Sequence, residues 1–108
     1  MKVREAQTAA CDDDCPVRKT ARIIDGKWTT MIIRDLLSGK KRYSELLASL
    51  HGISPRMLAE RLRFLEENKL LTKKIYPVIP PKTEYQLTAL GKGLGVVVAA
   101  MAEFGKRL

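Results

Sequence analysis

Residues 44–67, SELLASLHGISPRMLAERLRFLEE, decide the fold of this chain. Two apolar stripes at helical spacing are interrupted by His51-Gly52, which favours a turn. Ser44 is placed to cap the first helix. Ser54 and Pro55 begin the second, since they supply a capping side-chain oxygen and a ring that suits the first helical position. Two helices joined by so short a turn predict a helix-turn-helix motif.

Upstream of this motif the sequence predicts two more helices. One opens at Cys15-Pro16, because proline is tolerated at the first helical position. This helix ends at Gly26. The next begins at Trp28, repeats apolar residues at i, i+4 and i+8, and stops at Ser38-Gly39. Residues 40–42 then form a basic loop.

Downstream of the motif we expect a hairpin and a last helix. Residues 83–87 alternate in the way a half-buried strand requires, residues 71–76 are expected to form the other short strand, and prolines stiffen the tip between them. Thr88 is placed to cap a final helix over 88–108. Helix, helix-turn-helix, hairpin and helix in this order predict a mainly α winged helix-turn-helix, in which the small β-hairpin is the wing.

Length and composition limit the class of protein. The chain has 108 residues with a net charge of +8 and 45% hydrophobic residues, which suits one small domain with little room for a deep cavity. It has one His and no phosphate-binding loop, so we expect neither an enzyme nor a cofactor. No apolar run approaches the roughly 20 residues of a membrane span, and MKVREAQTAA lacks the apolar core of a secretory signal. These features predict a cytoplasmic protein without a membrane partner.

Positive charge is concentrated in the middle of the chain. Residues 27–82 carry twelve Lys or Arg against five Asp or Glu, whereas residues 1–26 and 83–108 have net charges of 0 and +1. This favours an anionic partner, with a solvated basic face that maintains solubility as the alternative. We expect residues 1–14 to form a polar arm and residues 15–108 to form the domain.

The second helix of the motif, over 55–67, has the properties of a DNA-recognition helix. The major groove admits one helix, and Arg reads guanine by paired hydrogen bonds. Cations before the motif and on the wing would meet phosphates. The expected DNA-contacting residues are Ser54, Arg56, Ala59, Glu60, Arg63, Lys40, Lys41, Arg42, Lys27, Lys73, Lys74 and Lys82. The alternative is a solvated helix face with i,i+4 pairs Arg56–Glu60 and Arg63–Glu67.

The last helix, 88–108, carries an apolar stripe longer than a small body needs. Together with the arm and the first helix it is the expected dimer surface; the alternative is packing within one chain. A two-fold dimer would place its recognition helices roughly 34 Å apart and read a pseudo-palindrome. The residues expected in this interface are Leu94, Val97, Val98, Met101 and Phe104.

Short motifs spread along the chain resemble those of HxlR-type bacterial and archaeal transcription regulators. They are Cys15-Pro16, Gly26-Lys27-Trp28, Arg42–Leu46, Gly52–Leu58, Arg61-Leu62, Leu65-Glu66, Pro80-Pro81, Glu84-Tyr85, Leu87-Thr88 and Gly91. The resemblance implies a homodimeric winged-helix protein that binds double-stranded DNA. In several relatives a cysteine near the first helix senses oxidants or electrophiles such as aldehydes and quinones. Two departures stand out: Tyr43 replaces the usual Phe, and Cys11 has no family role to carry over.

Two cysteines could give the chain a redox response. Cys15 lies at the N-cap of its helix, where the positive end of the dipole favours a thiolate, while residues 12–14, all Asp, oppose it. A Cys11–Cys15 disulfide, a bond between subunits and a purely structural Cys15 all stay open. These thiols, one distant His51 and the aspartates do not make a tetrahedral metal site.

One rival function remains at this stage. A basic winged helix can also bind protein or RNA without a specific DNA site, because its cations attract any polyanion. Selective binding to one duplex separates the two functions.

Overall fold

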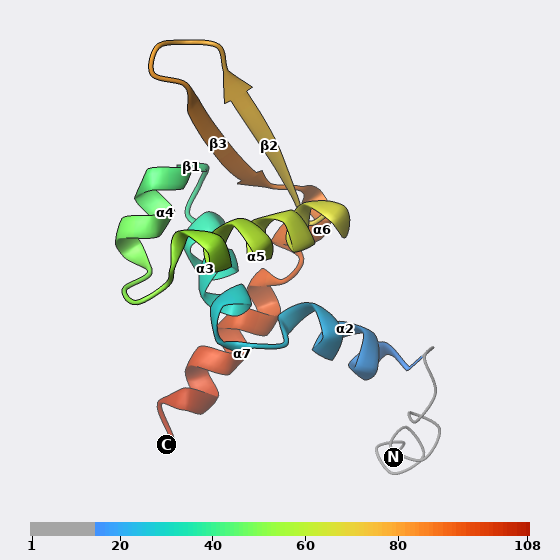
Figure 1. Cartoon of the computed structure of the whole chain (residues 1–108). Coiled ribbons are helices and arrows are strands. Elements are labelled where there is room, and N and C mark those ends of the chain that lie inside the picture. Colours follow the sequence, from blue (N-terminus) through green and yellow to red (C-terminus); the bar gives the residue numbers. More distant parts are fainter. Residues whose placement is uncertain (1–14) are drawn as a thin grey trace.

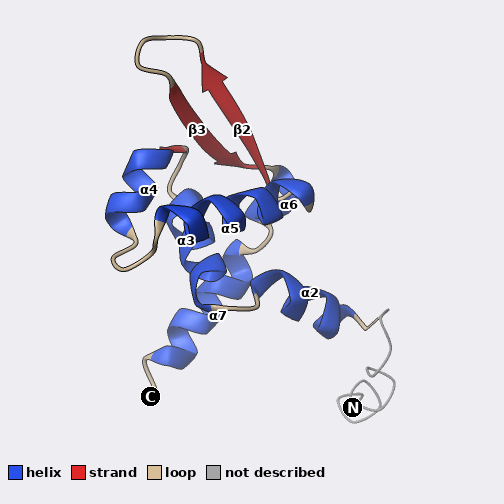
Figure 2. Cartoon of the chain, viewed as in Figure 1, coloured by secondary structure: helices blue, strands red, loops and turns tan. Residues whose placement is uncertain are grey.

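The structure is a computed structural model that describes residues 15–108, and it has the expected winged helix-turn-helix architecture (Figure 1). Helices α4 and α5 form the helix-turn-helix, and strands β2 and β3 form a hairpin that projects from the helical body (Figure 2). The elements are α2 (Pro16–Ile24), α3 (Lys27–Leu37), β1 (Lys41–Arg42), α4 (Tyr43–Ser49), α5 (Pro55–Glu67), β2 (Leu71–Tyr76), β3 (Lys82–Leu87), α6 (Ala89–Lys92) and α7 (Gly95–Gly105).

The core lies where α3, α4 and α5 meet the base of the hairpin. The buried positions follow the helical stripes of the sequence and then the inward-facing residues at the hairpin base, so burial of apolar area stabilises one continuous cluster. Its fully buried large side chains include Ile32, Ile33, Leu46, Leu50, Leu58, Leu62, Leu65 and Leu71. This cluster fixes α5 from below and leaves its other side to solvent.

The three strands form an antiparallel sheet in the order β1-β3-β2. Leu71 pairs with Leu87, and these side chains lie on the core face together with Tyr85. Lys74 pairs with Glu84 and Tyr76 with Lys82 on the opposite face. Beyond Leu71 the residues of β2 are exposed except for the half-buried Tyr76, so the outer part of the hairpin is a wing without a core beneath it.

The sheet corrects the prediction of a loop at 40–42. Lys41 pairs with Tyr85 and Arg42 with Glu84, so this segment is a short third strand. It also corrects the cap of the next helix: α4 begins at Tyr43, with Arg42 rather than Ser44 at the N-cap. The Glu45 carboxylate accepts a 2.7 Å hydrogen bond from the Arg42 N–H, so a side chain from the first turn satisfies this helix start.

The single helix predicted over 88–108 is wrong. Thr88 does cap a helix, since its Oγ1 accepts from the Gly91 N–H at 3.1 Å, but α6 ends after four residues and α7 begins at Gly95. Three glycines in five residues lower helix propensity there. Gly91 also packs so closely on the Leu70 carbonyl that any side chain would overlap it.

The C-terminal helix α7 packs against α3, and α2 extends away from the body without any buried residue (Figure 1). Within residues 15–108, no helix is both long and apolar enough to cross a membrane.

Candidate nucleic-acid interface

Helix α5 has the bounds predicted for it, and its start is well defined. The Ser54 Oγ accepts a 3.0 Å hydrogen bond from the Met57 N–H, and Pro55 occupies the first turn. Leu58, Leu62 and Leu65 face the core. The opposite side is therefore open, and it carries the exposed residues Ser54, Arg56, Ala59, Glu60 and Arg63.

Two side-chain hydrogen bonds set the position of the helix-turn-helix. The Tyr43 hydroxyl at the start of α4 donates to the Pro55 carbonyl at the start of α5 over 3.0 Å. The Ser49 hydroxyl at the end of α4 donates to the Asp35 carboxylate of α3 over 2.7 Å. Each bond joins two elements, so the outer side of α5 is held at a fixed angle to the rest of the domain.

One of the two expected ion pairs is formed on this face. The Arg56 Nε lies 3.3 Å from a carboxylate oxygen of Glu60, and the Arg56 side chain is 89% exposed. Among the described residues, Arg63 makes no such pair with Glu67. An ion pair this exposed contributes little to stability, so Arg56 can leave it at small cost.

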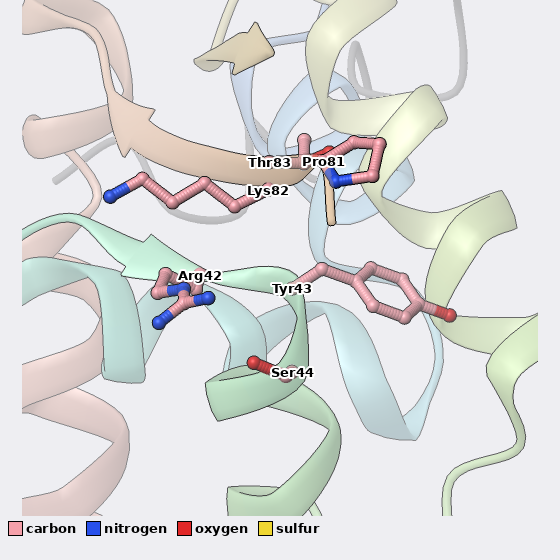
Figure 3. Close-up of a pocket in the computed structure, with 6 residues that line it drawn as sticks. All are labelled: Arg42, Tyr43, Ser44, Pro81, Lys82 and Thr83. Atoms are coloured by element: carbon pink, nitrogen blue, oxygen red, sulfur yellow. The ribbon is translucent and has the colours of Figure 1, made fainter. Parts of the chain in front are cut away.

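A cleft of about 270 Å³ lies between the start of α4 and the first residues of β3, in the distal part of the wing. Its walls are Arg42, Tyr43, Ser44, Pro81, Lys82 and Thr83, and Figure 3 shows the Tyr43 ring directed away from the cationic ends of Arg42 and Lys82. Two cationic side chains therefore border this polar cleft.

The remaining predicted cations are distributed over different surfaces. Lys27 begins α3 with its ammonium group 4.7 Å from the Trp28 ring centre, and that ring lies beside Gly52 in the turn before α5. Lys41 turns back to the Ser38 hydroxyl at 2.9 Å. On the wing, Lys73 lies on the sheet face that includes Leu71, whereas Lys74 lies on the other face.

The sequence reasoning missed a polar cluster on the wing. The Tyr76 hydroxyl donates a 2.7 Å hydrogen bond to the Glu84 carboxylate, and the Lys40 ammonium lies 3.9 Å from the same oxygen. The hydrogen bond from Tyr76 lowers the pKa of Glu84, with Lys40, Lys82 and Lys74 acting in the same direction. The same bond raises the pKa of Tyr76. Alternate residues of a strand share a face, so the sequence could have placed residues 72, 74 and 76 on the same face of the hairpin as residues 82, 84 and 86.

Tyr85 is the buried tyrosine of the wing strands, in contrast to the half-buried Tyr76. Tyr85 is 6% exposed, and burial raises the pKa of its hydroxyl, with Glu66 adding to the effect. It packs into the core beneath the wing, so it anchors the hairpin rather than offering a contact to a ligand.

Of the residues expected in a dimer interface, Leu94 and Val98 pack against the core of their own chain, as the alternative of packing within one chain predicts. Leu94, Val97 and Val98 are half-buried, while Met101 and Phe104 are 45% and 58% exposed. A mainly apolar groove of about 660 Å³ runs between α2 and the α6–α7 region. Its lining consists of Lys19, Thr20, Ile23, Asn68, Leu70, Leu90, Gly93, Leu94 and Val97.

Cys15 occupies the N-cap of α2, as predicted, but its side chain makes no capping hydrogen bond. It is a free thiol and only 7% exposed. Cys11 lies outside the described residues. In the part of the chain that the structure describes, no three His, Cys, Asp or Glu side chains gather as metal ligands.

Both the sequence and the structure of the chain are similar to those of transcriptional regulators. Residues 23–108 match the model of the HxlR-like helix-turn-helix family. An uncharacterized HTH-type transcriptional regulator of Synechocystis sp. is 38% identical over 91 residues, which cover 84% of this chain and 67% of that protein. A transcriptional regulator assigned to the MarR family from Porphyromonas gingivalis W83 superposes with a TM-score of 0.85 at 43% identity, covering 88% of this chain and 93% of that one. The oxidized form of the redox regulator HypR gives 0.80 at 37% identity, covering 87% and 97%.

Proposed function

The chain belongs to the HxlR-like helix-turn-helix family of transcriptional regulators, and we propose that it is a homodimer that reads a pseudo-palindromic DNA operator with helix α5 of each protomer. The relatives it resembles are described as HTH-type transcriptional regulators. The proposed function includes a cytoplasmic location, because a bacterial or archaeal chromosome lies in the cytoplasm.

The observation that carries the proposal is the open side of α5. Its exposed residues combine two arginines with the small side chains Ser54 and Ala59, so the helix can approach base edges closely. The basic segment Lys40–Arg42 lies before α4, and the wing stands beside it, so cations are available for the phosphates on either side.

Fluorescence anisotropy tests this proposal directly. The reduced protein is titrated into duplex DNA from upstream of its own gene and into a scrambled duplex, at several salt concentrations. We expect tight binding to the first and weak, steeply salt-dependent binding to the second. Equal binding to both would overturn sequence reading and favour the alternative, a winged-helix module that binds protein or RNA.

The homodimer rests on exposed apolar side chains at the two ends of the domain. Met101, Phe104 and Leu108 on one end and Val17 and Leu90 near the other are all at least 45% exposed. Large apolar side chains that are exposed together, such as Met101 and Phe104 on α7, often mark a surface that binds another protein. A second copy whose α7 enters the groove beside α2 would cover it.

Sedimentation tests the dimer. We expect the wild-type protein to sediment as a dimer and Phe104→Asp to sediment as a folded monomer, because a charge on that face cannot be buried without a partner. The monomer should bind a single half-site weakly. A dimeric Phe104→Asp variant, or a monomeric wild type, would overturn this interface.

A thiol response through Cys15 is the proposed regulation. The structural similarity to a redox regulator supports it, and so does the position of Cys15 at the start of the helix that borders the dimer groove. Since Cys15 is buried, an oxidant or electrophile reaches it only after the start of α2 moves. Diamide should lower the operator affinity of the wild type and leave that of Cys15→Ser unchanged, while Cys11→Ser shows whether a second thiol takes part. Unchanged affinity of the oxidized wild type would remove the sensor.

A further inference from the structure

The face of the wing opposite the core carries a compact arrangement of charge around one aromatic ring. We call it the outer wing face. Because paired residues in an antiparallel sheet share a face, Lys74 lies beside Glu84 there and Tyr76 beside Lys82. The full set is Thr72, Lys74, Tyr76, Lys82, Glu84 and Gln86.

Two lysines converge on the Tyr76 ring. The Lys74 ammonium lies 4.9 Å and the Lys82 ammonium 4.7 Å from the ring centre, both within the range of a cation–π contact. Tyr76 is half-buried, in contrast to Lys73, Lys74 and Ile75 before it in the strand. The ring therefore holds two flexible cationic side chains that would otherwise sample many rotamers.

A separate contact fixes the ring. The Tyr76 hydroxyl donates to Glu84 over 2.7 Å, and the Glu84 side chain is only 16% exposed. Lys40, which precedes β1, approaches the same carboxylate at 3.9 Å. Glu84 thus orients the ring from below and links the wing to the basic segment before α4.

We propose that Tyr76 is a positioning residue for DNA-backbone binding, whose ring presents the ammonium groups of Lys74 and Lys82 together to the phosphates beside the operator. This inference rests on the proposed function, since it assumes that the wing meets duplex DNA. The ring reduces the rotamer freedom that each lysine would lose on binding, so its contribution is independent of base sequence.

The first test replaces the ring. Tyr76→Leu should weaken binding to the operator and to the scrambled duplex by the same factor, about three- to tenfold, and should lower the slope of log affinity against log salt by about 1 to 2. Tyr76→Phe keeps the ring but loses the hydroxyl that orients it, so its affinity and slope should lie between those of the wild type and of Tyr76→Leu. Ile75→Ala, an exposed change on the other face of the same strand, is the matched control and should change neither quantity.

The second test asks whether Tyr76 acts through the lysines. In the Lys74→Ala/Lys82→Ala background, Tyr76→Leu should cause no further loss of affinity, because nothing is left to position. An undiminished loss in that background would mean that Tyr76 acts by another route and would overturn the proposal. So would a Tyr76→Leu variant with wild-type affinity and slope.

A third measurement does not depend on the folding of any variant. Ring currents from Tyr76 should move the ε-methylene protons of Lys74 and Lys82 upfield in the NMR spectrum of the wild-type protein, relative to those of Lys73. Unshifted protons would overturn the arrangement itself. Failure of the wild type to bind either duplex would instead contradict the proposed function, so the two failures are distinguishable.

Discussion

Helix α5 and the wing both present cations to solvent, but they are held in place by different forces. Three leucines bury the inner side of α5 in the core, and its exposed Arg56 has only a weak surface partner. The distal wing has no core beneath it and depends on cross-strand pairing, a tyrosine ring and one carboxylate. Packing fixes the element proposed to read bases, whereas polar contacts fix the element proposed to follow phosphates.

The difference predicts that stability depends on α5 far more than on the wing. Leu62→Ala removes a side chain that is 1% exposed, so the free energy of unfolding should fall by about 2–5 kcal/mol. Ile75→Ala on the wing, 61% exposed, should change it by no more than about 0.5 kcal/mol. Urea denaturation measures both. Similar losses for the two variants would mean that the wing is packed more firmly than its exposure indicates.

The two elements should also differ in how they affect DNA binding. Arg56→Ala should weaken binding to the operator by about 1–3 kcal/mol and relax the preference at one base, because a paired contact to guanine is lost. The affinity for the scrambled duplex should fall only by the amount expected from the removal of one positive charge. Lys92→Ala on α6 is the control for that charge. Equal losses on both duplexes would place Arg56 on phosphate rather than on a base.

Two tyrosines sharpen the comparison further. Tyr43→Phe removes a hydroxyl that ties α4 to α5, and it should lower the free energy of unfolding by about 0.5–1.5 kcal/mol. Tyr76→Phe removes a half-buried hydroxyl that joins the two strands of the distal wing, where no core lies beneath, so its loss stays local and should lower the unfolding free energy less. Thermal or urea unfolding of both variants checks the order, and the reverse order would contradict it.

The smallest expected effect is a shift in the pKa of one carboxyl group on the wing, that of Glu84. The hydrogen bond from Tyr76 keeps the pKa of Glu84 below its ordinary 4.5, so the carboxylate stabilises the folded state above that pH. This contribution is lost as the pH falls through the lowered pKa. Tyr76→Phe should raise the pKa of Glu84 toward 4.5, as an NMR titration of the Glu84 carboxyl carbon would show. Tyr43→Phe should leave it unchanged, and a shift there would contradict a local origin.

The parts of the fold that could be predicted from sequence are those with local signals. Ser54-Pro55 marks the start of α5, and alternation within 83–87 marks the second strand of the hairpin, because each signal lies within a few residues of the structure it specifies. Strand β1 has no such signal, since Lys41 and Arg42 become a strand only by pairing with residues more than forty positions later.

Missed features of the candidate site have the same origin. The Tyr76–Glu84 contact requires the register of β2 against β3, and the requirement for glycine at position 91 comes from its close approach to the Leu70 carbonyl. Neither distance is encoded at one position. The residue types on α5 were predictable, while their roles at a DNA surface stay predictions for the experiments above.

Strand β1 gives the domain a mechanical property. It is hydrogen-bonded to β3 on one side and continues directly into α4 on the other. A force applied to the wing tip is therefore transmitted along β3 to Arg42 and from there to the first turn of α4. The wing and the helix-turn-helix should therefore move together, and loss of the β1–β3 hydrogen bonds should be the first step by which they separate.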